Sequence, residues 1–128
     1  MSLKDSLRVM VIDDMAVSRG LIVQALEEIG IQKNTTENDA RVALGKLVAN
    51  PVHLVLSDLN MPGMDGMQLL KALRENKSTQ RIGFILVTGS PTPDLIARGQ
   101  ALGLNNMIKK PFTSITMKAC IEKVVGKL

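Results

Sequence analysis

The chain has 128 residues, of which 45% are apolar and 22% are charged, and its formal net charge is +4. This length and composition predict one domain with a buried core and exclude a disordered chain. Aromatic residues make up only 2% and include no Trp or Tyr, so the chain lacks the stacking side chains on which single-stranded nucleic-acid binders rely. The single cysteine excludes an internal disulfide framework, and no apolar run approaches the roughly 20 residues that span a membrane. We expect a cytoplasmic protein without a signal peptide or membrane insertion.

The excess positive charge is confined to the last third of the chain. Before residue 88, 10 Lys and Arg residues balance 10 Asp and Glu residues, whereas six basic and two acidic residues follow from Thr88 onward. This distribution predicts one basic face rather than a basic groove. DNA binding is also disfavoured, because a helix-turn-helix motif would have to use residues that the hydrophobic pattern assigns to alternating strands and helices.

The hydrophobic pattern predicts five strand–helix pairs along the chain. A strand over 7–13 leads into a helix over 15–29, and a weaker strand over 31–36 leads into a helix over 39–49, with Asn38 as its N-cap. The third pair is an apolar strand over 52–57 and, after a loop, a helix over 64–76. The last two pairs have strands over 82–88 and 104–109 and helices over 92–102 and 113–127.

Strands that alternate with helices of this length indicate βαβ units and a parallel sheet covered by helices on both faces. Right-handed crossovers leave few topologies, of which the doubly wound open sheet is favoured. We therefore expect a single α/β domain over 1–128 with five parallel strands and five helices.

Reactive side chains follow four of the five expected strands, at Asp13-Asp14, Asp58, Thr88 and Lys109-Lys110. Ligands of open α/β sheets bind at the carboxyl ends of the strands, so these side chains should converge. A single Asp after a strand is usually a turn former, but three clustered carboxylates repel one another. A divalent cation relieves that repulsion, and a ligand set of oxygen atoms suits Mg²⁺. We expect the only histidine, His53, to be structural.

The segment after the first strand carries neither a dinucleotide-binding glycine pattern nor a P-loop. A bound nucleotide would lack its backbone cradle. The remaining phosphate chemistry is one in which a carboxylate of the protein attacks phosphorus and becomes an acyl phosphate. That reaction depends on positioning and charge neutralisation by a metal, a lysine and a hydroxyl group.

Several motifs resemble a known family in the same order along the chain. The segment 57–66 (SDLNMPGMDG) resembles the loop around the family's phosphorylated aspartate, and Asp13-Asp14 resembles its acidic metal pair. Val87-Thr88 is similar to the switch hydroxyl and 110–112 (KPF) to the lysine motif. The family is the receiver domains of two-component response regulators, especially the stand-alone CheY-like ones. The resemblance covers the whole chain and implies a flavodoxin-like fold with no output domain.

The resemblance implies a role for each matching position. Asp58 would accept a phosphoryl group from a phosphohistidine of a sensor histidine kinase. Asp13 or Asp14, or both, would bind Mg²⁺ directly or through water, together with Asp58 and the backbone carbonyl of Asn60.

Other matching positions would contact the phosphoryl group or report its presence. Thr88 and Lys110 would contact phosphoryl oxygens, and the Lys110–Pro111 bond is expected to be cis. Thr88 and Met107 are the expected switch residues. Family members commonly have Tyr or Phe at the position of Met107, whose thioether can fill the space but lacks a ring. Signalling is thus expected to rely on backbone movement.

The leading interpretation is a phosphorylation-dependent change in affinity for an effector, such as a flagellar motor component in chemotaxis. The contact would use the fourth helix, fifth strand and fifth helix. The protein would not be an enzyme, beyond catalysing its own phosphorylation and autodephosphorylation. One alternative is a phosphate sink or relay intermediate without its own effector. Another is a small Mg²⁺-dependent phosphohydrolase, which would need a general acid where Asn60 stands.

Overall fold

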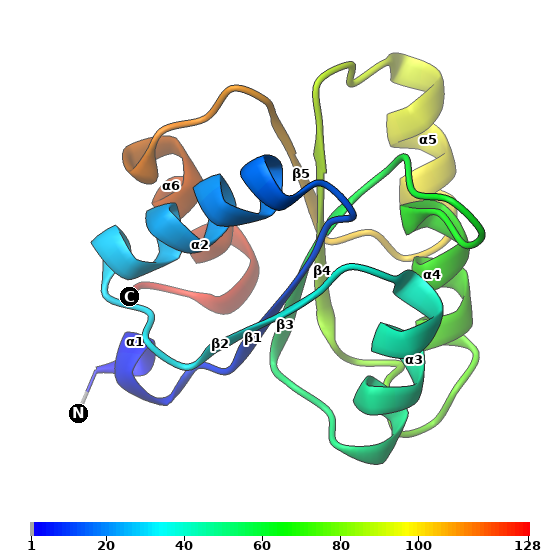
Figure 1. The fold of residues 1–128 in the computed structure, drawn as a ribbon, viewed down its shortest axis with the longest axis horizontal. Coiled ribbons are helices and arrows are strands. Elements are labelled where there is room, and N and C mark those ends of the chain that lie inside the picture. Colours follow the sequence, from blue (N-terminus) through cyan, green and yellow to red (C-terminus); the bar gives the residue numbers. More distant parts are fainter. Residues whose placement is uncertain (1) are drawn as a thin grey trace.

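The computed structural model describes residues 2–128, which form one parallel sheet with helices on both faces (Figure 1). The strand order is β2-β1-β3-β4-β5, and every pairing is parallel. The strands are β1 (Val9–Ile12), β2 (Asn34–Glu37), β3 (Leu54–Asp58), β4 (Gly83–Thr88) and β5 (Asn106–Lys109). The predicted doubly wound, five-stranded flavodoxin-like sheet is confirmed.

Five of the helices correspond to those expected, and a short sixth precedes the first strand. They are α1 (Leu3–Ser6), α2 (Ala16–Ile29), α3 (Ala40–Ala49), α4 (Gly66–Arg74), α5 (Pro93–Ala101) and α6 (Ser114–Val125). Helices α2 and α6 lie on one face of the sheet, and α3, α4 and α5 lie on the other (Figure 1). Across residues 2–128, no helix is both long and apolar enough to cross a membrane.

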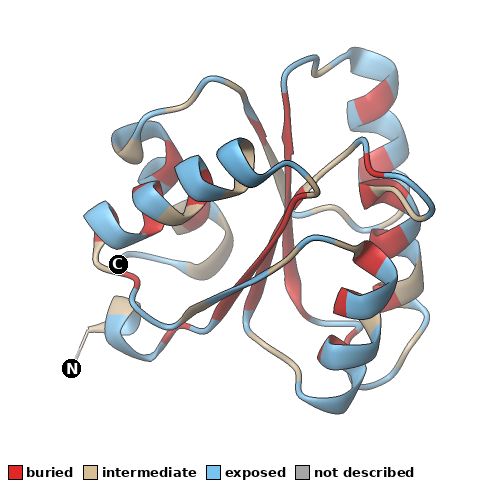
Figure 2. Ribbon diagram, viewed as in Figure 1, coloured by how far each residue is buried: buried red, intermediate tan, exposed pale blue. Residues whose placement is uncertain are grey.

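The core consists of two apolar layers separated by the sheet. Strands β1, β3 and β4 are buried along almost their whole length (Figure 2), because helices cover both of their faces. Alternate strand residues point into opposite layers. The layer under α2 and α6 takes Val9, Val11, Leu54, Leu56, Ile85 and Val87. The layer under α3, α4 and α5 takes Met10, Ile12, Val55, Phe84 and Leu86.

The structure corrects the predicted starts of two helices. The N-cap of α3 is Asp39, not Asn38, because the Asp39 Oδ1 accepts a hydrogen bond from the Arg41 N–H at 2.9 Å. Helix α4 begins at Gly66 rather than at residue 64. Its start is fixed by Asp65, whose carboxylate accepts from the Gln68 N–H at 2.8 Å while the Gln68 side chain accepts from the Asp65 N–H at 2.9 Å.

The strand register brings the reactive ends of the strands to one edge of the sheet. Ile12 pairs with Ser57, so Asp13 and Asp58 both follow that pair. Asp58 in turn pairs with Val87, and Thr88 pairs with Lys109. The residues singled out after four different strands therefore meet in space.

Candidate functional site

Three carboxylates form the centre of the site. Oxygen atoms of Asp13, Asp14 and Asp58 all lie within 4.8 Å of one another. The Asp13 side chain is completely buried, whereas 13% of the Asp58 side chain is exposed. Within residues 2–128, the buried Asp13 Oδ2 and Asp14 Oδ1 atoms have no hydrogen-bond partner. Buried oxygens of this kind carry a large desolvation cost, and a cation bound among them would relieve it.

The turn between β1 and α2 holds Asp13 in place from two directions. The Asp13 Oδ1 accepts a hydrogen bond from the Met15 N–H at 2.9 Å. The Arg19 guanidinium donates to the Asp13 backbone carbonyl at 2.8 Å. The first turn of α2 and the acidic pair are thereby fixed relative to each other.

Lys110 brings a positive charge to the carboxylates from the end of β5. Its Nζ lies 3.2 Å from Asp58 Oδ1 and 3.6 Å from Asp13 Oδ2; the second distance fits an ion pair but is too long for a hydrogen bond. The Lys110 N–H donates to the Thr88 carbonyl at 2.8 Å, which anchors the lysine to β4. The Lys110–Pro111 bond is cis, as the resemblance implies.

The electrostatic environment of Asp58 raises its pKa above the ordinary value of 3.8. Burial is the main cause, because it disfavours the charged form. The hydrogen bond and positive charge of Lys110 act in the opposite direction, and the negative charge of Asp13 adds to the rise. A hydrogen bond from the Leu59 backbone lowers it slightly. The Asp58 carboxylate is thus partly exposed, and the opposing effect of Lys110 does not cancel the rise in its pKa.

Comparisons with known proteins agree with this geometry. Residues 9–122 match the family described as "Response regulator receiver domain". The chain belongs to the receiver domain family. It is 40% identical to the "Probable chemotaxis protein CheY" of Rhizobium etli, over all of this chain and 99% of the relative. It is thus closely related to CheY chemotaxis proteins.

Two solved structures show the same fold. The chemotaxis protein CheY4 of Vibrio cholerae superimposes with a TM-score of 0.85 at 27% identity, covering 92% of this chain and 98% of that one. The receiver domain of sensor histidine kinase PA1611 from Pseudomonas aeruginosa superimposes with a TM-score of 0.84 at 19% identity, covering 94% and 98%. The latter structure has a magnesium ion coordinated in its active site cleft.

The remaining predicted positions of this receiver domain differ in how close they lie to the carboxylates. Thr88 ends β4 at the same edge, is 4% exposed, and accepts a hydrogen bond from the Ser90 N–H at 3.2 Å. Asn60 is exposed in the loop between β3 and α4. Met107 lies earlier on β5, beside Leu86, and packs half-buried against the layer under α3, α4 and α5. Its pairing with Leu86 lies two register steps before the pairing of Thr88 with Lys109.

Sequence reasoning missed two residues of the site. The Ser18 hydroxyl on α2 accepts a hydrogen bond from Lys110 Nζ at 2.8 Å. A Cβ atom added at Gly66 would lie 2.4 Å from the Asp58 carbonyl oxygen. The sequence offered one signal for each residue. Ser18 is a polar residue in the first helical turn after Asp13-Asp14, and Gly66 is the glycine that ends the acceptor-loop motif.

His53 takes the structural role expected of it. It is exposed just before β3, and its Nδ1 accepts a hydrogen bond from the Arg8 N–H at 2.9 Å. This bond joins the starts of β1 and β3 at the edge of the sheet opposite the carboxylates.

Proposed function

We propose that this receiver domain accepts a phosphoryl group on Asp58 in a Mg²⁺-dependent reaction and thereby changes its affinity for a partner protein. The observation that carries the proposal is the position of Asp58. Its carboxylate is partly exposed at the end of a buried strand, 3.2 Å from the Lys110 ammonium and next to two carboxylate oxygens without hydrogen-bond partners.

The donor atoms fit Mg²⁺. The set consists of carboxylate oxygens, two of them buried and, within residues 2–128, without a hydrogen-bond partner. By the resemblance of the loop, the backbone carbonyl of Asn60 would add a further oxygen. When bound, the ion would neutralise negative charge on the carboxylates and on an incoming phosphoryl group. The magnesium-bound receiver domain of PA1611, which shares the fold, supports this assignment.

The chain's own residues divide the chemistry between them. An Asp58 oxygen attacks phosphorus, the bond from phosphorus to the donor nitrogen breaks, and the electron pair leaves with the donor's imidazole. Lys110 stands where it can pair with a phosphoryl oxygen in place of the carboxylate oxygen it now contacts. Thr88 supplies a hydroxyl group from the neighbouring strand end.

The proposed phosphoryl donor is a phosphohistidine of a sensor histidine kinase. Such a donor protein must cover the edge of the sheet to reach Asp58. Exposed apolar side chains stand at that edge on α2, where Met15 is 61%, Val17 78% and Leu21 55% exposed. A cluster of exposed apolar groups beside a reactive centre favours a protein as the donor over a free small molecule.

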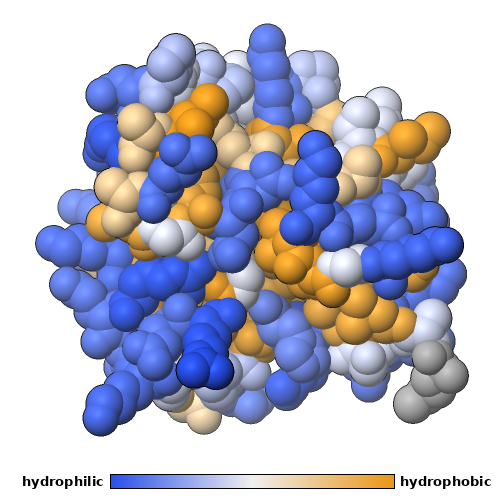
Figure 3. All heavy atoms as spheres, turned by 180° about the vertical axis from the view of Figure 1, so that it is seen from behind, coloured by the Kyte–Doolittle hydropathy of each residue, from blue (hydrophilic) through white to orange (hydrophobic). Residues whose placement is uncertain are grey.

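The proposed effector surface consists of α5, β5 and α6, the fourth helix, fifth strand and fifth helix of the sequence-based numbering. Seen from behind (Figure 3), the molecule carries apolar patches between hydrophilic side chains. Ile96 on α5 is 39% exposed and Ile115 on α6 is 81% exposed. The exposed basic residues of this region are Arg98, Lys109, Lys118, Lys123 and Lys127. An effector with an acidic or mixed surface, such as a flagellar motor component, would fit, and its binding should weaken as salt rises.

The test is phosphotransfer from a histidine kinase, or from acetyl phosphate, with intact-mass detection of the phosphoryl group. We expect one Mg²⁺-dependent phosphoryl group per chain on the wild-type protein and none on Asp58→Asn. Labelling that survives in Asp58→Asn would overturn the site assignment. Turnover of small phosphate esters beyond one equivalent would instead indicate the phosphohydrolase.

A phosphate sink remains the second candidate function, and the position of Met107 favours it. Met107, half-buried on β5, has no ring and so offers no aromatic group to carry the signal. Binding of phosphorylated and unphosphorylated protein to candidate effectors separates the two. Equal binding in both states would support the sink.

A further inference from the structure

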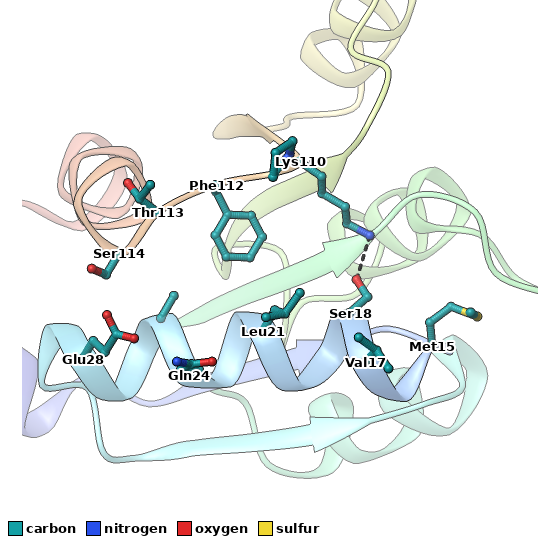
Figure 4. A pocket seen from close by; sticks show the side chains of 12 residues that line it. Met15, Val17, Ser18, Leu21, Gln24, Glu28, Lys110, Phe112, Thr113 and Ser114 are labelled. Atoms are coloured by element: carbon teal, nitrogen blue, oxygen red, sulfur yellow. Dashed lines mark hydrogen bonds between the residues drawn. The ribbon is translucent and has the colours of Figure 1, made fainter.

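A groove with a volume of about 740 Å³ runs between α2 and the segment that joins β5 to α6 (Figure 4). Its lining is largely apolar and includes Leu21 and Phe112. The end nearest the carboxylates is formed by two polar residues, Ser18 and Lys110, which are joined by a hydrogen bond. This contact links α2 directly to the lysine of the site.

The Lys110 ammonium has three N–H donors, and two hydrogen bonds of its nitrogen are seen in the structure. The shortest contact is to the Ser18 Oγ, at 2.8 Å. The contact to Asp58 Oδ1 is longer, at 3.2 Å. Ser18 adds no charge, so it can hold the nitrogen without competing electrostatically with the carboxylate.

Among the described residues, the Ser18 hydroxyl hydrogen-bonds to Lys110. Ser18 is the third residue of α2, whose N-cap is Met15 and has no side-chain cap bond. Within residues 2–128, the recorded hydrogen bond of the Ser18 side chain is the one from Lys110. Because Ser is a weaker helix former than Ala, this position is not explained by the helix itself.

The backbone around Ser18 is fixed relative to the carboxylates. The Arg19 guanidinium donates to the Asp13 carbonyl at 2.8 Å, and the Arg19 N–H donates to the Met15 carbonyl at 2.9 Å. Met15 is itself bonded to the Asp13 side chain. Ser18 is therefore a rigid support, whereas the lysine stem is a flexible four-carbon chain.

We propose that Ser18 is a positioning residue for Lys110, holding the ammonium beside Asp58 while the carboxylate takes up its phosphoryl group. This inference rests on the proposed phosphorylation of Asp58. The Lys110 side chain is 28% exposed, so without Ser18 the ammonium can turn toward water. The ammonium would then have to turn back toward Asp58 each time it binds a phosphoryl oxygen.

The test compares Ser18→Ala, which removes the hydroxyl, with Ser18→Thr, which keeps it. Gln24→Ala is the matched control, because Gln24 is exposed on the same helix and lines the same groove without contacting Lys110. Phosphorylation by acetyl phosphate with Mg²⁺ is followed by intact mass. We expect Ser18→Ala to be about fivefold slower, as suits the loss of one partly exposed hydrogen bond to a charged group. Ser18→Thr and Gln24→Ala should stay within about twofold of wild type by the same reasoning.

A second readout needs neither metal nor phosphate. The ammonium NMR signal of Lys110, assigned by its absence in Lys110→Arg, should exchange with water faster in Ser18→Ala than in wild type. Equal exchange rates in wild type and Ser18→Ala would overturn the proposal. So would a phosphorylation rate of Ser18→Thr as low as that of Ser18→Ala, because the slower reaction would then be due to altered packing and not to the lost hydroxyl. If wild type takes no phosphoryl group while Ser18→Ala still speeds the exchange, the proposed function fails but the contact stands.

Discussion

Replacing Gly66 by Ala should disturb the site through the backbone of Asp58. The added Cβ would lie 2.4 Å from the Asp58 carbonyl oxygen, 2.9 Å from Leu86 Cδ1 and 3.2 Å from Leu59 Cα. The Leu86 methyl can turn aside, but the Asp58 carbonyl belongs to β3, which is paired with β4 on one side and β1 on the other. Gly66 is also tied to this segment by its own N–H, which donates to the Leu59 carbonyl at 2.8 Å.

The expected loss of stability follows from how far the added Cβ atom must move away from the Asp58 carbonyl oxygen. A carbon atom rests at roughly 3.3 Å or more from a carbonyl oxygen, so the start of α4 must move by nearly 1 Å or Asp58 must shift. Overpacking of this kind costs about 1–3 kcal/mol, and we expect the free energy of unfolding to fall by about 2 kcal/mol.

The chain offers two matched controls for Gly66→Ala. Gly20 in α2 and Gly45 in α3 are exposed, and a Cβ at either would meet nothing within 4 Å. Gly20→Ala and Gly45→Ala should each raise the free energy of unfolding by about 0.5–1 kcal/mol, because Ala restricts the unfolded chain and favours the helix.

Urea unfolding followed by far-UV circular dichroism suits this chain, which has no Trp or Tyr for fluorescence. With a slope of about 2 kcal/mol per molar urea, the Gly66→Ala midpoint should fall by about 1 M. Its phosphorylation by acetyl phosphate should also slow under conditions where it is folded, while the controls keep the wild-type rate. A Gly66→Ala midpoint equal to that of wild type would refute the reasoning, because the clash would then be relieved at no cost.

Three further predictions concern charge and hydrogen bonding. Burial raises the pKa of Asp58 above 3.8, so the stability contributed by its protonated form is present below pH 3.8 and is lost as pH rises through the folded-state pKa. Without Mg²⁺, Asp58→Asn should therefore have a higher free energy of unfolding than wild type at about pH 7, and the difference should shrink toward about pH 4. Urea unfolding at several pH values measures this, and a difference that does not change with pH would contradict the prediction. Mg²⁺ at 100 times its Kd should raise the free energy of unfolding by about 2.7 kcal/mol, and Asp13→Asn should remove most of that gain in thermal unfolding. Arg74 donates to the carbonyls of residues 80, 82 and 103 and to the side-chain oxygen of Asn105, so Arg74→Ala should cost about 2–3 kcal/mol in urea unfolding, whereas exposed Lys71→Ala should cost almost nothing.

The fold was predictable where the sequence pattern reflects burial on both faces. Strands β3 and β4 are continuous apolar runs because helices cover them on each side, and their predicted positions differ little from the observed ones. Strand β2 (NTTE) lies at the edge and is polar. The prediction therefore began at Ile31, which is buried but lies before the strand. Helix α1 has four residues, which is too few to show a period.

The site was predictable to the extent that it depends on topology. Asp13, Asp58 and Lys110 follow parallel strands, so their convergence follows from the order of elements alone. Ser18 and Gly66 contribute through distances between helices and strand ends. Ser18 meets Lys110 across 92 positions of sequence, and the need for a glycine at residue 66 arises from how closely α4 approaches β3. Neither distance is encoded in a local pattern.

The charges at the carboxyl ends of the strands relate the raised pKa of Asp58 to the proposed metal site. Three carboxylates meet the Lys110 ammonium here, so negative charge exceeds this positive charge when all are ionised. Burial is the main cause that raises the pKa of Asp58, and the negative charge of Asp13 adds to the rise. A divalent cation bound among the carboxylates would offset this excess of negative charge. A proton on Asp58 would block the nucleophile that we propose, whereas a bound Mg²⁺ would favour its ionised form. Lys110 brings its ammonium to these carboxylates from the end of β5, and we propose that Ser18 holds it there.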